Sequence, residues 1–344
     1  MVLKIMKKLA GEITQFQNEL KRREPKQAGQ KISREAFTLL LSGISTCRKA
    51  PGILGHMGYE SLYHCINEDA AGQTRKHLAD LYGIHDRESL ENAFVREFSD
   101  GNRYEYFMTF WSGAPVFDPQ ELHPEARDIF LEGMEQAKPF YPLVKEKGFY
   151  AWDINEKIGL CRKAAACGIL TEEEFWEVTD PWVRQAQVFY HSWEEYAVSC
   201  LCGAVYFMRC PDMKELEDFL HLNMKLMRQL LSEDGAWGKN CWYTPKEKEW
   251  AELFEPEVLC LATKKVLEEN RIGYMYKEMP AEDFLDSGWR FLAGDEPEEY
   301  IADPENISIV PFSDLCNIDP TVLAYFNAEC GREFEKREDG WTEI

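Results

Sequence analysis

The chain has 344 residues, of which 45% are hydrophobic and 29% are charged. This length exceeds the usual size of one domain and predicts about two, and the composition is that of a folded globular protein rather than a disordered one. The net charge of −22 at pH 7 would be repelled by phosphates, which argues against a nucleic-acid ligand.

Membrane insertion, secretion and disulfide bonding are not expected either. No apolar run reaches the roughly 18 residues that a membrane-spanning helix needs, and residues 1–15 lack the continuous apolar stretch of a secretory signal. The eleven cysteines are scattered, and no C-x-x-C pair occurs among them. Disulfide frameworks are denser than this, and zinc sites show paired cysteines. The sequence therefore predicts free thiols in a cytoplasmic protein without a cofactor or metal site.

The charge is distributed unevenly along the chain. Residues 256–344 hold 21 acidic and 8 basic residues, a net charge of −13, whereas residues 1–49 hold 4 acidic and 11 basic residues, a net charge of +7. A dense acidic region can steer a basic partner toward the protein, because opposite charges accelerate encounter. It can equally serve only to keep the protein soluble.

The first predicted helix carries a regular apolar stripe. Spacings of four and three residues alternate along Val2, Met6, Leu9, Ile13, Phe16 and Leu20. This heptad pattern predicts a helix that packs against the rest of its own chain, or one that pairs with a second copy and forms an oligomer through residues 2–20. A further helix is predicted from Ser33, a good N-cap, to about Cys47.

Helix-start signals are frequent in the middle of the chain. Asp153, Thr171 and Ser192 are each followed three residues later by a glutamate, which is the pattern of a capping box. Gly168 lies where the helix after Asp153 is expected to end. The predicted helices span residues 154–167, 172–179, 182–190, 193–209 and 212–231.

The pattern changes near Pro256. Residues 257–266 and 272–278 are rich in apolar and aromatic residues and flank a predicted hairpin turn at 268–271, and further strands are expected at 289–293, 307–311 and 332–336. Asp319-Pro320 predicts a short helix. We therefore expect a mainly α, bundle-like N-terminal part and a small α+β C-terminal domain with an antiparallel sheet. The expected organisation is N-terminal helices at 1–50, a helical domain at 51–250 and the α+β domain at 256–344.

Catalytic and metal-binding signatures are absent from the sequence. It holds no H-E-x-x-H, no G-x-S-x-G and no phosphate-binding P-loop. His191 and Glu194 are spaced as two metal ligands could be, but metal sites need three or four ligands. The acidic run of residues 295–299 lacks the spacing of a calcium loop, so it is either a solvated turn or a contact for a basic protein surface.

Short motifs in the middle of the chain follow the order of a known family. They are residues 82–90, 151–153, 161–162, 168–174 and 192–195. Through them, residues 70–245 resemble the bacterial family called domain of unknown function 1266, in which arginine often stands in place of Lys157. The resemblance implies a helical fold, since several of the matching residues are the expected helix caps.

The C-terminal region matches a second family more closely. The matching residues are 260–265, 273–276, 286–291, 294–296, 299–300, 306–307 and 331. This region resembles domain of unknown function 2185, an immunity-protein-33-like family grouped with the immunity proteins of bacterial toxin systems. The resemblance implies a protein that neutralises a protein toxin by binding it.

Six residues of the C-terminal domain are the expected contacts with that toxin. They are Trp289, Arg290, Asp295, Glu296, Glu299 and Tyr300. An aromatic ring and a guanidinium would serve as anchors, and the carboxylates would supply steering and specificity. The structural alternative is that Trp289 belongs to the core and that residues 294–295 form a simple turn.

Two other functions stay open at this point. The helical domain could be an enzyme or a small-molecule-binding module with a site built from Arg162, His191 and Glu194, which would require a cleft where these groups converge. The chain could also be an assembly module that dimerises through residues 2–20.

Overall fold

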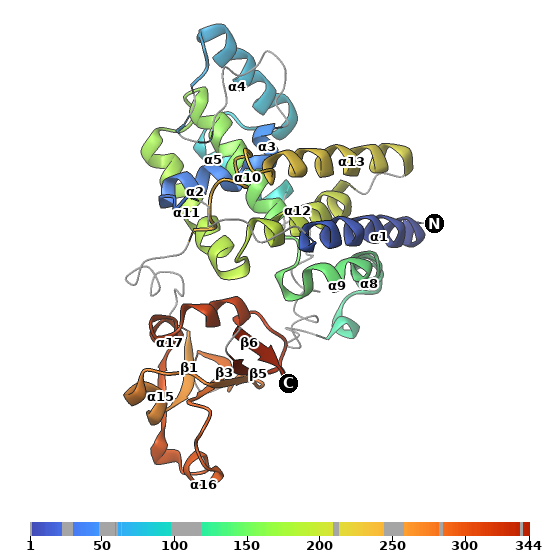
Figure 1. The fold of residues 1–344 in the computed structure, drawn as a ribbon. Coiled ribbons are helices and arrows are strands. Elements are labelled where there is room, and N and C mark those ends of the chain that lie inside the picture. Colours follow the sequence, from blue (N-terminus) through green and yellow to red (C-terminus); the bar gives the residue numbers. More distant parts are fainter. Residues whose placement is uncertain are drawn as a thin grey trace. The chain divides into compact units, whose positions relative to one another are not determined.

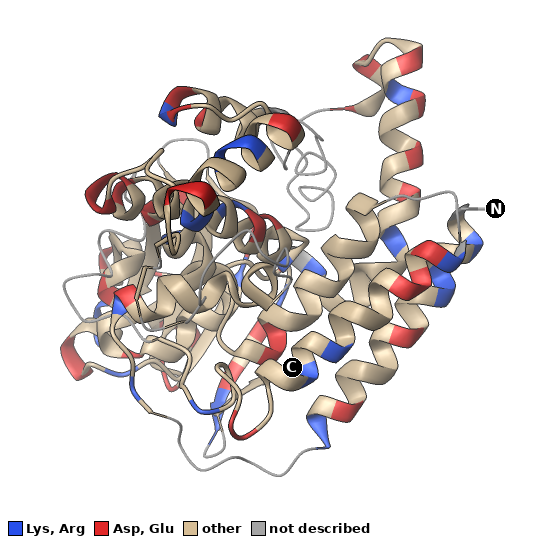
Figure 2. Cartoon of the chain, turned by 90° about the horizontal axis from the view of Figure 1, so that it is seen from above, with Lys and Arg blue, Asp and Glu red and all other residues tan. Residues whose placement is uncertain are grey.

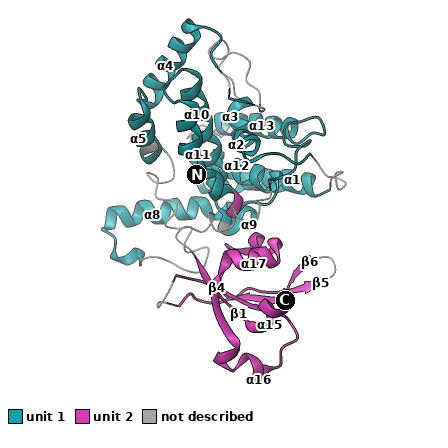
Figure 3. Cartoon of the chain, turned by 90° about the vertical axis from the view of Figure 1, so that its left-hand side faces the viewer, with its two compact units in different colours: residues 1–108, 117–186, 190–243 teal, residues 109–116, 187–189, 244–344 magenta. Residues whose placement is uncertain are grey.

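The computed structural model describes residues 2–22, 30–47, 59, 61–62, 64–97, 118–208, 213–243, 258–281, 285–337 and 340–344. These residues divide into two compact units (Figure 3). The first, the helical unit, comprises the described residues up to Tyr243 apart from 187–189; residues 187–189 and 258–344 belong to the second, the sheet unit. The change of pattern near Pro256 and the expected boundary near residue 50 lie outside the described residues.

The described part of the helical unit consists of helices and loops, as expected for a mainly α part (Figure 1). Its α-helices are α1 (Val2–Lys21), α2 (Arg34–Leu41), α3 (Gly43–Cys47), α4 (Glu68–Tyr82), α5 (Arg87–Glu97), α8 (Pro124–Ala137), α9 (Tyr141–Val144), α10 (Tyr150–Ala166), α11 (Glu172–Phe189), α12 (Trp193–Met208) and α13 (Met213–Leu230). Three short 3-10 helices accompany them, η1 (Pro119–Glu121), η2 (Lys138–Phe140) and η3 (Lys145–Lys147).

The sequence located several helix ends correctly. Ser33 accepts a hydrogen bond from the Ala36 backbone N–H at the start of α2. Thr171 and Glu174 form the predicted capping box, because the Thr171 hydroxyl accepts from the Glu174 N–H (3.2 Å) and the Glu174 carboxylate accepts from the Thr171 N–H (2.8 Å). Gly168, with φ of +79°, ends α10 in the left-handed conformation that favours glycine.

Removing the Thr171 cap should weaken the helical unit measurably. In a Thr171→Ala variant the Glu174 N–H loses its partner, and we expect a loss of about 1 kcal/mol in the free energy of unfolding. Urea titration followed by circular dichroism at the helix band measures it, and Thr171→Ser is the control that keeps the hydroxyl. A Thr171→Ala chain as stable as the parent would contradict this role.

Two helix predictions were wrong because tertiary contacts override local signals. Asp153 does not cap α10; the helix begins one turn earlier, and the Tyr190 hydroxyl accepts the free Ala151 N–H at 2.8 Å instead. Residues 172–179 and 182–190 are not two helices, since α11 runs through Pro181. Burial of the α11 side chains of Phe175 and Val183 on either side of that proline holds the helix together.

Helix α1 packs within the helical unit. The apolar stripe is buried, with no side chain more than 7% exposed at Ile5, Met6, Leu9, Ala10, Ile13, Phe16 and Leu20. Helices α8, α12 and α13 contact it. Glu12 pairs with His221 and Glu19 with Arg228, both at 2.8 Å and both 209 residues apart, so α1 and α13 run parallel. The stripe therefore serves the fold of its own chain in this structure.

The sheet unit contains a six-stranded sheet in the order β4-β1-β3-β2-β5-β6. Its strands are β1 (Leu259–Thr263), β2 (Tyr274–Lys277), β3 (Asp286–Leu292), β4 (Ile307–Pro311), β5 (Glu333–Arg337) and β6 (Gly340–Glu343). Strands β1 and β3 are parallel and every other neighbouring pair is antiparallel. The remaining elements are α15 (Lys264–Glu269), α16 (Glu298–Ile301), η5 (Pro304–Asn306), α17 (Phe312–Ile318) and η6 (Pro320–Tyr325).

The predicted hairpin at 268–271 was wrong. Thr263 accepts a hydrogen bond from the Val266 N–H and so starts helix α15, which ends at Asn270 in the left-handed conformation (φ 51°). A helical connection allows β1 to pair in parallel with β3, whereas a tight turn would have forced β1 against β2. The predicted strand at 307–311 and the short helix after Asp319 are both present.

One face of the sheet carries the core of this unit. Alternate strand residues point to it, and helical residues such as Val266, Leu315 and Val322 join them. The strand residues in this core are Cys260, Ala262, Met275, Trp289, Phe291 and Phe334. The residues of opposite parity form the second face of the sheet.

Candidate partner-binding surface

Trp289 lies in the core of the sheet unit. Its side chain is fully buried, its ring is nearly parallel to that of Phe291 with the centroids 5.9 Å apart, and its indole N–H donates to the Phe326 carbonyl at 3.0 Å. The Lys277 ammonium lies 5.7 Å from the ring centroid. The indole thus has apolar neighbours and a satisfied donor, which are the properties of a structural tryptophan.

Arg290 projects from the opposite side of β3 and is held by two carboxylates. It is 6% exposed, its Nη1 and Nη2 atoms lie 2.9 and 2.7 Å from the two oxygens of Asp286, and its Nε lies 2.6 Å from Glu278. Burial would raise the pKa of Asp286, but the hydrogen bonds from Arg290 and from backbone N–H groups outweigh it and lower that pKa. These three residues form one fixed cluster of ion pairs with one surplus negative charge.

Glu296 organises the acidic turn after β3. Its carboxylate accepts hydrogen bonds from the Thr263 hydroxyl (2.6 Å) and from the backbone N–H groups of Ala293 (2.7 Å), Gly294 (2.7 Å) and Asp295 (3.2 Å). These bonds outweigh the effect of burial and lower the pKa of Glu296. The turn is therefore defined by one side chain that bonds to its own backbone and to the end of β1.

The remaining predicted contacts are more accessible. Asp295 is exposed but pairs with Lys265 (2.9 Å) and Arg271 (3.0 Å), so part of its charge is compensated within the unit. On α16, Glu299 is exposed and Tyr300 is half-buried. A partner can reach Asp295, Glu299 and Tyr300 directly, whereas the buried Trp289 and Arg290 and the half-buried Glu296 would act by shaping the surface around them.

The structure adds a surface that sequence analysis missed. On the second face of the sheet, strand register places Ile309, Leu261, Arg290, Tyr276 and Glu333 in one row across five strands. The neighbouring row contains Thr263, Leu292, Tyr274 and Glu335. The alternation of residue types along β2 and β5 was the available signal, but it identifies a face only when the strand order is known.

The three residues considered for a site in the helical unit lie in α10, in the first turn of α12 and just before α12. Arg162 on α10 is fully buried, and its guanidinium donates to Ser42 (3.2 Å) and Thr46 (2.9 Å) near the junction of α2 and α3. Glu194 lies in the first turn of α12. His191 precedes that helix, and its backbone N–H donates to the Glu195 carboxylate at 3.0 Å.

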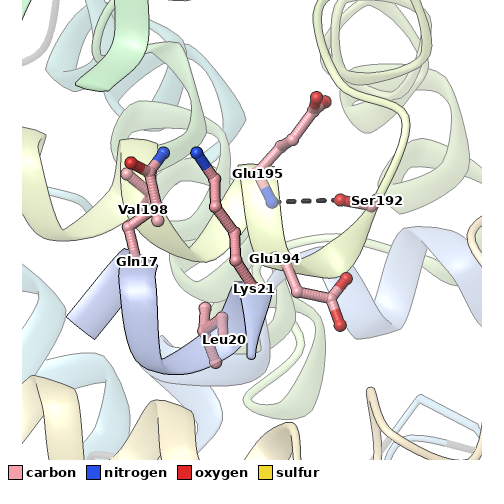
Figure 4. A pocket seen from close by; sticks show the side chains of 7 residues that line it. All are labelled: Gln17, Leu20, Lys21, Ser192, Glu194, Glu195 and Val198. Atoms are coloured by element: carbon pink, nitrogen blue, oxygen red, sulfur yellow. Dashed lines mark hydrogen bonds between the residues drawn. The ribbon is translucent and has the colours of Figure 1, made fainter. Parts of the chain in front are cut away.

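A small pocket lies beside the first turn of α12. Its volume is about 230 Å³, and Figure 4 shows the side chains that line it, with the Ser192 hydroxyl accepting the Glu195 N–H at 3.1 Å. The lining residues are Gln17, Leu20, Lys21, Ser192, Glu194, Glu195 and Val198. Glu194 is the one member of the proposed trio that lines it, so the pocket does not unite Arg162, His191 and Glu194.

His191 is the most perturbed histidine among the described residues. Burial, followed by the nearby Lys147 ammonium, lowers the pKa of His191 to about 4, against the opposing pull of Glu195. Its Nε2 atom is buried and has no hydrogen-bond partner among the described residues. The imidazole is therefore neutral at pH 7, and a proton added to it would find no acceptor.

This perturbation predicts a pH-dependent stability. The unfolded chain binds a proton at His191 near pH 6.5 and the folded chain only near pH 4, so stability is complete above about pH 6.5 and falls as the pH drops toward 4. Allowing for partial solvent access, we expect a loss of about 1–2 kcal/mol over this window. Urea titrations at several pH values should show a shallower decline for His191→Gln, and equal slopes would contradict the prediction.

Metal and thiol chemistry find little support in the described part of the chain. Nowhere in these residues do three or more His, Cys, Asp or Glu side chains gather as metal ligands would. The ten described cysteines are free and six of them are buried. Burial raises the pKa of the Cys161 and Cys260 thiols far above their ordinary value, so neither is a nucleophile at neutral pH.

Figure 2 shows Asp and Glu spread over many elements rather than gathered in one patch. None of the helices in the described ranges combines the length and the apolar character that crossing a bilayer requires.

Comparison with known families gives this surface its context. Residues 77–242 match the model of a protein family of unknown function, DUF1266, and residues 260–344 match that of the Immunity protein Imm33 domain. Along the chain, a region that matches the DUF1266 model is followed by a region that matches the Imm33 model. This is the fused arrangement that the sequence motifs indicated. A comparison with curated proteins and one with solved structures found no match.

The match places the candidate surface inside the Imm33 domain. Five strands of the sheet lie entirely within residues 260–344 and β1 begins one residue earlier, so the domain model covers nearly the whole sheet. The DUF1266 match covers helices α5 to α13 and the last turns of α4. The DUF1266 family is one of unknown function, whereas the name of the Imm33 family refers to immunity proteins.

Proposed function

We propose that this chain is an immunity-type protein that neutralises a bacterial toxin in the cytoplasm by binding it. The observation that carries the proposal is the match of residues 260–344 to the Immunity protein Imm33 domain, because this name implies protection against a toxin. The acidity of this region supports a basic partner, because summed opposite charge accelerates and orients association. Nucleic acid is not proposed as a ligand, for the same electrostatic reason.

The shared motif residues have roles that suit a binding protein. Arg290 donates hydrogen bonds to Asp286 and Glu278, and Glu296 accepts hydrogen bonds from the backbone of the acidic turn. Both residues therefore hold a surface in place. In the proposal, Asp295, Glu299 and Tyr300 contact the toxin directly, and Trp289, Arg290 and Glu296 position the strand and turn that present them. A rigid surface lowers the entropic cost of binding.

A growth assay tests this function. Open reading frames next to this gene in its native genome would be expressed one at a time in a laboratory bacterium, with and without the full chain. We expect at least one to arrest growth and the chain to restore it, with a stoichiometric complex on gel filtration. If no neighbouring product is toxic, or if toxicity persists when the chain is in excess, the proposal fails.

The pocket beside α12 supports a second candidate, a small-molecule site in the helical unit. Lys21, Glu194 and Glu195 place charges of both signs around about 230 Å³, which is below the usual volume of a ligand site. A thermal-shift screen of zwitterionic metabolites would test it. A rise in melting temperature that Glu194→Ala abolishes would favour this function, and a screen without a shift would exclude it.

A further inference from the structure

The second face of the Imm33 sheet has an apolar centre that the core does not cover. Ile309 on the edge strand β4 is 57% exposed, and its row neighbours Leu261 and Tyr276 are half-buried. Leu259 and Tyr274 add further partly exposed apolar and aromatic surface on the same face. The strand residues of the first face are buried beneath α17 and η6, whereas the apolar residues named here on the second face remain partly accessible to solvent.

Arg290 sits in the middle of this apolar row without offering a free positive charge. Arg290 is 6% exposed, its guanidinium is bonded to Asp286 and Glu278, and the Asp286 side chain is itself fully buried. Such a fixed cluster resists rearrangement, because separating the pair would leave a buried charge uncompensated. What the cluster shows to solvent is the half-exposed carboxylate of Glu278.

The border of the second face is acidic. Glu333 is exposed and accepts the Tyr274 hydroxyl at 2.5 Å, and Glu335 is half-exposed beside Arg337. Counting Asp286 and Glu278, four carboxylates face two guanidinium groups, those of Arg290 and Arg337, which leaves a net charge of −2. The Glu296–Thr263 hydrogen bond connects the acidic turn to the same face.

This composition, with an apolar centre and an acidic border, is typical of a protein-binding surface. Interfaces have centres enriched in aromatic and aliphatic side chains with few free charges, and rims that are polar and accessible. Tyrosines are frequent among the residues that contribute most of the binding energy. An acidic rim matches a basic partner and disfavours an acidic one, because like charges brought together cost several kcal/mol.

We propose that the second face, defined by Leu259, Leu261, Tyr274, Tyr276, Arg290, Ile309, Glu333 and Glu335, is the surface on which a partner protein docks, and that the partner presents an apolar centre within a basic rim. The inference rests on the proposed function and deepens it, because it assigns the binding centre to the sheet face and the rim to the acidic border at Glu333 and Glu335, beside the acidic turn. A second copy of this chain is the weaker alternative, since two acidic rims would repel each other.

The first test uses a defined probe, a phage-displayed library of random peptides selected on the immobilised full chain. The proposal expects enriched peptides that combine aliphatic or aromatic residues with Lys or Arg. Ile309→Arg should weaken their binding by about tenfold or more, because it places a cation in the apolar centre. Glu335→Lys should weaken it by about threefold and reduce its dependence on salt.

Matched controls separate the surface from general effects. Leu267 is also exposed, on α15, and Leu267→Arg makes the same kind of change away from the second face. Glu268→Lys is the corresponding charge control on that helix. Ile309 is exposed enough for an arginine to extend into solvent, and circular dichroism verifies that each variant is folded. The proposal is overturned if selected peptides bind Ile309→Arg as tightly as the parent, if they lack basic residues, or if no peptide is enriched.

The second test uses a toxin that the parent chain neutralises. Ile309→Arg should lose protection and Leu267→Arg should keep it, with a corresponding loss of complex on gel filtration. Protection retained by Ile309→Arg would refute the docking surface while leaving the immunity function in place. Conversely, if the parent neutralises no toxin, the proposed function fails, and the peptide selection still decides whether the second face binds basic partners.

Discussion

A chain carrying Arg290→Met is expected to lose about 3–5 kcal/mol of stability in the sheet unit, because Asp286 would stay buried with its negative charge uncompensated. Asp286 would keep the backbone N–H groups of Ala281 and Gly288 as donors, at 2.9 Å each, but would lose both guanidinium contacts. Hydrogen exchange measured by mass spectrometry on peptides from β1 and β3 reports this unit separately from the helical one.

The stability that the Arg290–Asp286 pair contributes should depend on pH. The pKa of Asp286 is lowered in the folded chain, so the pair stabilises the fold above about pH 4 and ceases to do so as the pH falls through the folded value. The double variant Arg290→Met, Asp286→Leu removes both charges and should recover much of the loss. A single variant that costs less than about 1 kcal/mol would show that water or the Ala281 and Gly288 N–H groups already compensate the charge of Asp286.

Replacing Trp237 by alanine should destabilise the helical unit by about 3–5 kcal/mol, the usual cost of removing a large buried ring. The indole is 1% exposed and lies parallel to Trp193, at 7° between the planes and 5.2 Å between centroids. Its N–H donates to the Leu40 carbonyl at 2.9 Å, which ties residues far apart in the chain together. Urea unfolding followed at the helix band of the circular dichroism spectrum measures the loss.

A Trp237→Phe variant separates packing from the hydrogen bond. It keeps an aromatic ring against Trp193 and leaves the Leu40 carbonyl without its donor, so we expect a smaller cost of about 1–2 kcal/mol. Gly43 lies directly against the indole, since a Cβ there would approach its Nε1 to 2.8 Å, and this limits how the cavity can refill. Similar costs for both variants would show that the hydrogen bond, rather than the ring volume, dominates.

The predictions for Arg290 and Trp237 both concern side chains that bond to, or pack against, other residues of the same unit. Polar residues of the motifs that resemble the two families, including Arg162, Thr171, Arg290 and Glu296, bond to the backbone or to other side chains of their own unit. The hydrogen-bonding groups of these residues are occupied in holding helices and turns in place. Function in a binding protein then depends on the surface that these residues support, and such a surface has no short sequence motif.

Local signals were sufficient for much of the fold. The caps at Ser33, Thr171 and Ser192 and the left-handed end at Gly168 depend on hydrogen bonds within a few residues, so the sequence alone located them. The fold class, a helical part followed by a small domain with a sheet, also followed from periodicity and turn chemistry. The motifs of the two families can also be identified from the sequence, because the residues of each motif are close together in the chain.

Only the tertiary structure decided the features that depend on distant residues. Which helices of its own chain α1 contacts, whether α11 breaks at Pro181, and whether β1 joins β2 or β3 are choices between partners far apart in sequence. The same holds for the candidate surface, where β3 directs Trp289 into the core and Arg290 to the second face. A side chain's face follows from strand order and register, and these are set by packing energies that no local pattern contains.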